Sequence, residues 1–206
     1  MRVLGMDEAG RGCVLGPLVV GAFFLVDGEQ ATLRAAGAND SKILSAQRRA
    51  EARARLETLG TGVVVEVSPQ QIDQGNINTL EEDAFVALIQ RFQPDEVYLD
   101  APVNPRGIPA FTRRLLARIA PLTPRMTVEP KADATWPVVG AASIYAKLHR
   151  DAAIEALGPV GSGYPSDPVT RAWLQGFLTR GEPLPSCVRT RWGTLGELRQ
   201  QGLFGV

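Results

Sequence analysis

The hydrophobic positions of the chain follow two different periods, which together predict an α/β fold. Apolar runs at residues 2–6 and 18–26 are expected to be strands joined by a glycine-rich turn, and the β-branched run at 63–67 is expected to be a third strand. Shorter strands at 96–99 and 126–129 then alternate with helical segments. Three N-terminal strands followed by a βαβα alternation predict a mixed central sheet with helices on both faces.

Capping residues mark several of the expected helices. Ser45 is expected to cap a helix that ends near Gly60, and residues 78–81 (NTLE) have the form of a capping box for a helix to about residue 92. Asp167 and Pro168 have N-cap and N1 character for a helix ended by a glycine. Further helices are expected at 110–120, at 139–157 and close to the C-terminus. We predict one domain over residues 1–206, with a helical C-terminal extension from about residue 168.

Composition excludes several classes of protein. With 45% hydrophobic and 21% charged residues the chain resembles an ordinary globular domain, and no apolar run approaches the ~18 residues that span a bilayer. Charges near the N-terminus also argue against a signal peptide, so a soluble, cytoplasmic protein is expected. Cys13, Cys187 and the single histidine, His149, make neither a disulfide framework nor a good zinc set, and free thiols are expected.

The charge pattern leaves the type of partner open. The chain has 22 basic and 22 acidic side chains, so a nucleic-acid interface would have to be local. Residues 106–125 carry five arginines and no acidic residue, which fits either a basic stripe or a solvated helix face. The three lysines, Lys42, Lys131 and Lys147, suggest positions that need a compact ammonium group.

Acidic residues follow the expected strands at three places. Asp7 and Glu8 end the first strand, Asp100 ends the strand at 96–99, and Asp133 precedes the long helix. Each acid alone could be a turn former or a helix cap. Together they predict a site at the carboxyl edge of the sheet, and carboxylates without histidine or thiolate select hard divalent cations such as Mg²⁺ or Mn²⁺.

Five segments resemble the signature blocks of the type 2 ribonuclease H family, ribonuclease HII, in the same order and at similar spacing. They are GMDEAGRGCVLGPLVV, NDSKILS, VYLDAP, KADATWPVVGAASIYAKLHRD and GSGYPSDP, and they span residues 5–168. GSGYPSDP and INTLEEDAF are more similar to the archaeal and eukaryotic branch. Ile43 and Tyr145 depart from the common family pattern without removing a carboxylate. The resemblance implies a ribonuclease H-like fold.

The same resemblance implies a role for each matching residue. Four carboxylates would hold two divalent ions, Mg²⁺ or Mn²⁺, on either side of the scissile phosphate: Asp7, Glu8, Asp100 and Asp133. Backbone groups of Gly10, Arg11 and Gly12 would contact the ribonucleotide 2′-hydroxyl, and Tyr164 would pack on the following sugar. Phosphate contacts are implied for Asn39, Ser41, Lys42, Ser143 and Lys147, and a helix N-terminus at Gly140-Ala141-Ala142 is expected to add backbone N–H groups unless that run serves close packing.

The implied activity is that of an endoribonuclease. It would hydrolyse the RNA strand of RNA/DNA hybrids and cut 5′ of single ribonucleotides in duplex DNA, leaving 5′-phosphate and 3′-hydroxyl ends, in ribonucleotide excision repair and DNA replication. The alternatives are a non-catalytic hybrid-binding protein on the same fold, which four carboxylates facing phosphate disfavour, and a phosphotransferase or ATPase, for which the chain is too short. A monomer is expected, and because residues 200–204 (QQGLF) only faintly resemble a sliding-clamp-binding peptide, clamp binding is not expected.

Overall fold

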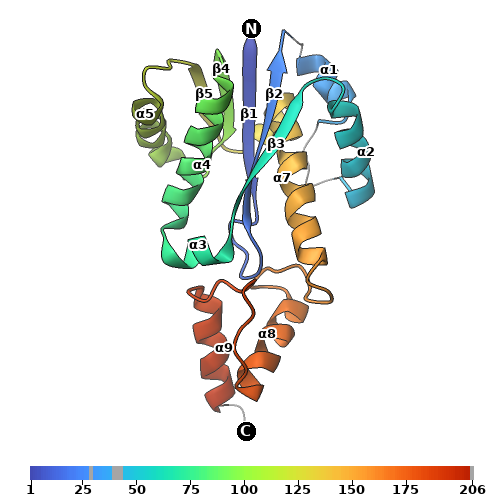
Figure 1. Ribbon diagram of the computed structural model, residues 1–206, viewed down its shortest axis with the longest axis vertical. Helices are drawn as coiled ribbons and strands as arrows, with labels where there is room; N and C mark the ends of the chain where they lie inside the picture. Colours follow the sequence, from blue (N-terminus) through green and yellow to red (C-terminus); the bar gives the residue numbers. More distant parts are fainter. Residues whose placement is uncertain (28–29, 39–43, 205–206) are drawn as a thin grey trace.

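The computed structural model describes the chain except residues 28–29, 39–43 and 205–206, and it describes the backbone alone for 201–204. One five-stranded sheet forms the centre of the molecule (Figure 1). Its strands are β1 (Arg2–Ala9), β2 (Leu18–Val26), β3 (Thr61–Val67), β4 (Glu96–Asp100) and β5 (Arg125–Glu129).

The sheet is mixed, as predicted. Its order is β3-β2-β1-β4-β5. The three N-terminal strands pair antiparallel, whereas β4 pairs parallel to both β1 and β5, with Met6 opposite Leu99 and Asp100 opposite Glu129. Because β1, β4 and β5 run in one direction, their carboxyl ends meet at a single edge of the sheet.

Helices cover both faces of the sheet, which confirms the predicted layering. They are α1 (Gln30–Ala35), α2 (Ala46–Leu56), α3 (Pro69–Gln74), α4 (Ile77–Phe92), α5 (Ile108–Ile119, after the 3₁₀ turn Pro105–Gly107), α6 (Ala132–Thr135), α7 (Pro137–Glu155), α8 (Pro168–Arg180) and α9 (Gly193–Phe204). One core joins α7, α1 and α2 to one face, and a second joins α4 and α5 to the other. In Figure 1, α4 and α5 lie on the left of β1, and α7 and α2 on its right.

Helix α7 lies unusually close to β1 and β2 because glycines face it. A Cβ atom on Gly5 would lie 2.2 Å from the carbonyl oxygen of Val138, and one on Gly21 would lie 2.3 Å from that of Ala142. The small residues of α7 therefore allow close helix-to-sheet packing. This was one of the two interpretations of the Gly140-Ala141-Ala142 run. The predicted helix N-terminus at Gly140-Ala141-Ala142 is wrong: α7 begins at Pro137, and the N–H of Gly140 donates to Trp136.

The capping residues explain which helix boundaries were predictable. Ser45 and Asp167 cap α2 and α8 as predicted. The capping box at 78–81 is wrong, because Asn76 accepts hydrogen bonds from the backbone N–H groups of residues 78 and 79 and starts α4 two residues earlier. The short helices α1, α3 and α6 were not predicted.

The arginine-rich segment at 106–125 is largely neutralised by acids on neighbouring elements. Arg114 and Arg118 pair with Glu82 of α4, and Arg125 pairs with Glu96 of β4. The segment therefore does not present five unpaired cations to a partner.

Other sequence expectations concern the two cysteines, the single histidine and membrane-spanning helices. Cys13 and Cys187 are free thiols, and His149 lies on the surface of α7 next to Glu66. Within the described residues, no helix has the length and apolar character needed to cross a bilayer.

The C-terminal part is helical, as predicted, and lies beyond one end of the sheet. In Figure 1, α8 and α9 lie below the lower end of β1, at the opposite end of the molecule from the N-terminus. They share a core with Val14, Leu15 and Ile154. A bridge between Leu15 and Val188 joins this part to the segment that follows β1.

Candidate active site

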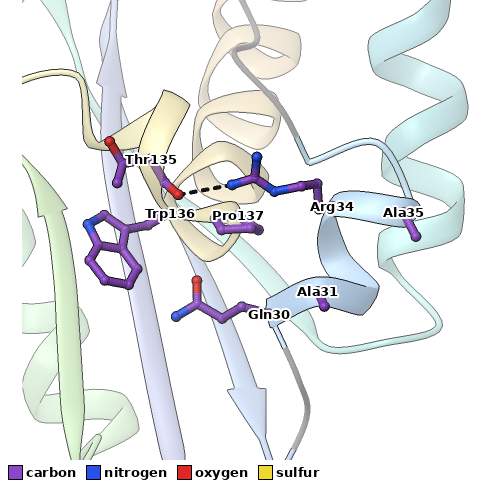
Figure 2. A pocket seen from close by; sticks show the side chains of 7 residues that line it. All are labelled: Gln30, Ala31, Arg34, Ala35, Thr135, Trp136 and Pro137. Carbon is purple, nitrogen blue, oxygen red and sulfur yellow. Dashed lines mark hydrogen bonds between the residues drawn. The ribbon is translucent and has the colours of Figure 1, made fainter.

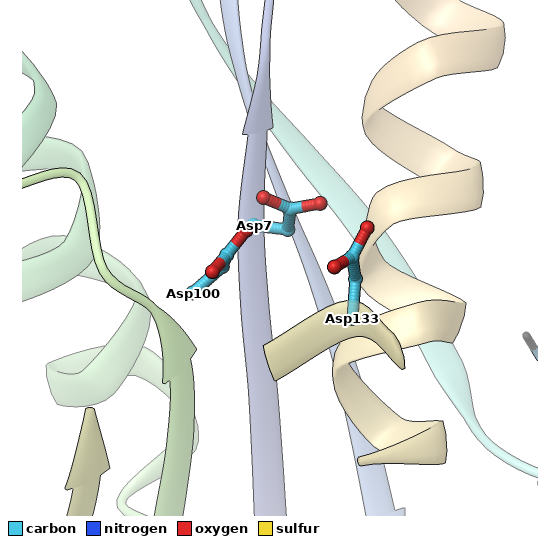
Figure 3. A group of neighbouring side chains, drawn as sticks. All are labelled: Asp7, Asp100 and Asp133. Carbon is cyan, nitrogen blue, oxygen red and sulfur yellow. The ribbon is translucent and has the colours of Figure 1, made fainter. Parts of the chain in front are cut away.

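Three aspartates converge at the carboxyl edge of the sheet. Asp7 comes from β1, Asp100 from β4 and Asp133 from α6, and one carboxylate oxygen of each lies within 4.8 Å of the others. Figure 3 shows the three carboxylates pointing toward one another. Asp7 accepts a hydrogen bond from the N–H of Glu8 at 2.8 Å, and Asp100 accepts one from the N–H of Ala132 at 3.1 Å. A backbone N–H group of β1 therefore orients Asp7, and one at the start of α6 orients Asp100.

Burial makes this cluster electrostatically costly. Burial raises the pKa of Asp7 to about 7, the hydrogen bond with Ser143 opposes that rise, and the charges of Asp100 and Asp133 add to it. Like charges this close cannot all be ionised without a compensating cation. The donor set contains only carboxylate oxygens, which suits Mg²⁺ or Mn²⁺.

Glu8 lies beside this cluster and is not one of the three mutually close acids. Successive strand residues point to opposite faces, so its side chain leaves β1 on the side away from Asp7. Its Oε2 atom is buried without a hydrogen-bond partner among the described residues. Burial, followed by the charges of Asp7 and Glu81, raises the pKa of Glu8 well above its ordinary value.

A cavity of about 200 Å³ joins Asp7, Glu8 and Asp100 to most of the other predicted site residues, while Asp133 lies outside its lining. Asn39, Ser41 and Lys42 lie outside the described residues. The cavity is lined by Asp7, Glu8, Ala9, Gly10, Arg11, Gly12, Asp100, Ser143, Lys147, Arg150, Asp151 and Tyr164. Segments that follow β1 and α7 thus meet the carboxyl edge of the sheet here.

The loop from Gly10 to Gly12 has little room at Gly10, whereas Gly12 has open space around it. Gly10 has φ +82°, and a Cβ atom there would lie 2.6 Å from the carbonyl oxygen of Pro17. Only glycine adopts that conformation at such a close approach without strain. The Arg11 side chain is bound by Glu81 and Asn78 of α4.

Tyr164 contacts Arg150 and Cys13, neither of which was predicted to belong to the site. The Arg150 guanidinium lies 4.9 Å from the ring centre of Tyr164, and its Nη2 atom donates to Cys13 Sγ at 3.0 Å. Arg150 lies three residues after Lys147, so helical spacing alone could have placed both on one face of α7. The role of Cys13 depends on a fold contact that the sequence does not reveal.

A second hollow, between α1 and the junction of α6 with α7, has a different character (Figure 2). It is lined by Gln30, Ala31, Arg34, Ala35, Thr135, Trp136 and Pro137. Arg34 donates to the carbonyl oxygen of Thr135 at 3.0 Å and so ties α1 to α6. Among the described residues no acid contributes to its lining, which separates it from the carboxylate site.

Comparisons with known proteins agree with this geometry. The family model for ribonuclease HII matches residues 4–195. The chain is 41% identical to the ribonuclease HII of Archaeoglobus fulgidus over 97% of each chain. The crystal structure of the ribonuclease H2 from Pyrococcus horikoshii superimposes with a TM-score of 0.87 at 36% identity, over 98% of both chains.

A further solved structure bears on the expectation about the sliding clamp. The PCNA:RNase HII complex from Archaeoglobus fulgidus contains a chain that matches 99% of this one, with a TM-score of 0.86 and 38% identity. That relative was solved together with a clamp, which argues against our expectation that clamp binding does not occur. From the family model, the identities and the shared fold, the chain belongs to the ribonuclease HII family and is a ribonuclease H type 2 enzyme.

Proposed function

We propose that this enzyme hydrolyses the RNA strand of RNA/DNA hybrids and cuts duplex DNA on the 5′ side of single ribonucleotides, leaving 5′-phosphate and 3′-hydroxyl ends. One observation carries the proposal: the cluster of Asp7, Asp100 and Asp133 contributes Asp7 and Asp100 to the lining of the cavity that the Gly10–Gly12 loop also lines. A loop that can contact a 2′-hydroxyl and carboxylates that can bind divalent cations therefore meet at the same cavity.

The residues present fit a divalent cation. Asp7, Asp100 and Asp133 would hold it, and Glu8, whose buried oxygen lacks a protein partner, would complete the set for a second ion. Mg²⁺ or Mn²⁺ bound there would supply Lewis-acid activation of water and neutralise charge on the leaving oxygen. Ser143 donates to Asp7 and so orients that ligand.

The remaining cavity residues would bind and orient the substrate. Backbone groups of Gly10, Arg11 and Gly12 would contact the 2′-hydroxyl, and the ring of Tyr164, which is 39% exposed, would pack on the next sugar. Lys147 would contact a backbone phosphate, and we propose the same for Asn39, Ser41 and Lys42. Because the Ser143 hydroxyl forms a hydrogen bond with the Asp7 carboxylate, we propose that Ser143 orients this metal ligand in preference to contacting a phosphate.

This activity would serve ribonucleotide excision repair and primer removal during replication. A non-catalytic hybrid-binding protein is the alternative. It would have no use for three close carboxylates, two of them buried, that repel both one another and a phosphate backbone. Clamp binding through the C-terminal segment is a separate hypothesis, which titration of a labelled peptide of residues 195–206 with purified PCNA would test.

Cleavage of a labelled RNA/DNA hybrid tests the proposal. The parent protein should cleave in Mg²⁺ or Mn²⁺ and not in EDTA, while Asp7→Asn and Asp100→Asn should lose about 10² or more in rate, as expected when a group that stabilises the transition state is removed. The exposed Arg180→Gln is the matched control, because Arg180 is the last residue of α8, pairs with Glu182 and does not line the carboxylate cavity. Binding of the hybrid without cleavage by the parent would support the non-catalytic alternative.

A further inference from the structure

Arg189 is a fully buried cation that comes from the C-terminal part of the chain and reaches the loop after β1. Its side chain has no exposed surface. The three guanidinium nitrogens donate to three backbone carbonyl oxygens: Nε to Gly16 at 3.0 Å, Nη1 to Arg11 at 3.0 Å and Nη2 to Gly10 at 2.7 Å. These partners are 173 to 179 residues away along the chain.

Burying a cation in this way is costly. Within the described residues, Arg189 forms no ion pair with a carboxylate, and its charge is solvated by the three carbonyls and by the ring of Trp192, whose centre lies 5.0 Å from Cζ. Burial lowers the pKa of Arg189 to about 10, which leaves the group charged at neutral pH. A cation buried against backbone carbonyls alone is uncommon, because it gives up hydration without an opposite charge.

The geometry of the peptide bond gives these contacts a consequence for the cavity. In a planar trans peptide, the carbonyl of one residue and the N–H of the next point in opposite directions. When Arg189 draws the carbonyls of Gly10 and Arg11 toward the buried side, the N–H groups of Arg11 and Gly12 point the other way. Both residues line the catalytic cavity on that other side, and neither N–H donates to a backbone carbonyl among the described residues.

We infer that Arg189 is a positioning residue, which fixes the peptide planes of the Gly10–Gly12 loop so that their N–H groups face the 2′-hydroxyl. This inference rests on the proposed function, since that function assigns the loop to the 2′-hydroxyl. It also means that the C-terminal part contributes to substrate choice. The segment that carries Arg189 is held in place by hydrogen bonds from Thr190 to Asp73 of α3 and by the bridge between Leu15 and Val188.

Arg189→Lys tests the inference, because lysine keeps the charge but has one nitrogen and cannot span three carbonyls. The measurement is fluorescence anisotropy with two labelled DNA duplexes in Ca²⁺, identical except that one carries a single ribonucleotide. The parent should bind the ribonucleotide duplex more tightly. In Arg189→Lys the ratio of the two dissociation constants should fall about tenfold, the value of roughly one net hydrogen bond.

Two readouts separate positioning from general stability. The affinity of the protein for Mn²⁺, measured by calorimetry without DNA, should be unchanged in Arg189→Lys, because Arg189 contacts none of the three aspartates. Trp192→Leu is the matched control. It removes the ring packed on the guanidinium and destabilises the same region, yet it leaves the three carbonyl contacts in place, so it should keep the parent's discrimination.

The outcomes are distinct. Unchanged discrimination in Arg189→Lys would overturn the inference, as would an equal loss in Trp192→Leu. If both Arg189→Lys and Arg189→Gln fail to fold by thermal melting, the residue is structural and the inference is overturned as well. A parent that shows no discrimination at all would instead contradict the proposed function.

Discussion

Replacing Asp7 by asparagine should stabilise the protein in the absence of metal while it destroys activity. The reason is that Asp7 is 4% exposed and lies next to two other carboxylates, so its charge is tolerated only when a cation compensates it. Its Oδ1 atom accepts the N–H of Glu8, a bond that the asparagine carbonyl can keep, and the new amide N–H₂ group can donate to the neighbouring acids.

The size of the effect follows from the pKa. Asp7 has its pKa raised from 3.8 to about 7. Since each tenfold change in an ionisation equilibrium corresponds to about 1.4 kcal/mol, ionised Asp7 destabilises the metal-free fold by at most about 4 kcal/mol. The folded state binds the proton more tightly than the unfolded chain does, so the penalty is absent below pH ~4, grows as pH rises toward 7, and is complete above it.

The assay is thermal unfolding of the parent and Asp7→Asn in EDTA at pH 8.0 and at pH 4.0. At pH 8.0 the variant should melt several degrees higher, at about 2–4 °C per kcal/mol for a chain of this size. At pH 4.0 the difference should largely vanish. Adding Mg²⁺ at pH 8.0 should raise the melting temperature of the parent alone. A variant that melts at or below the parent in EDTA at pH 8.0 would refute this account of the cluster.

Three further predictions concern packing, a buried ion pair and substrate choice. Gly21→Ala should cost about 1–3 kcal/mol or more in urea unfolding, because its Cβ atom would lie 2.3 Å from Ala142 O; a neutral result would contradict the packing of α7 on β2. Arg11→Ala should cost about 3 kcal/mol at pH 7.5 by leaving buried Glu81 unpaired. It should cost less at pH 5.0, because burial raises the pKa of Glu81 and protonation removes the unpaired charge; equal losses at both pH values would argue against an electrostatic cause. Tyr164→Ala should reduce cleavage at a single embedded ribonucleotide more than cleavage within a long hybrid, and equal losses on both substrates would exclude its proposed place at the RNA-to-DNA junction.

The convergence of the three aspartates was predictable from strand order. Asp7 and Asp100 each follow an uninterrupted apolar run, and parallel strands bring such ends to one edge. The different direction of Glu8 also follows from strand alternation, although the family resemblance implied that all four acids act as one set. Local patterns therefore placed the centre of the site without knowledge of the fold.

The contacts around that centre were not predictable, because they join segments far apart in the chain. Arg189 lies in a stretch with no periodic signal, and its partners are the carbonyls of residues 10, 11 and 16. In the same way, Glu82 neutralises arginines more than 30 residues away on α5. The false capping box at 78–81 has a related cause, since Glu81 is committed to Arg11.

The most direct test of the central claim uses two duplexes that differ by one 2′-hydroxyl. The parent protein is incubated in Mg²⁺ or Mn²⁺ with duplex DNA containing one ribonucleotide and with the all-deoxy duplex, and the products are mapped on a sequencing gel. The account predicts a single cut on the 5′ side of the ribonucleotide, with a 5′-phosphate on that nucleotide and no cut in the all-deoxy duplex. Cleavage of both duplexes, or undiminished cleavage by Asp133→Asn, would contradict it.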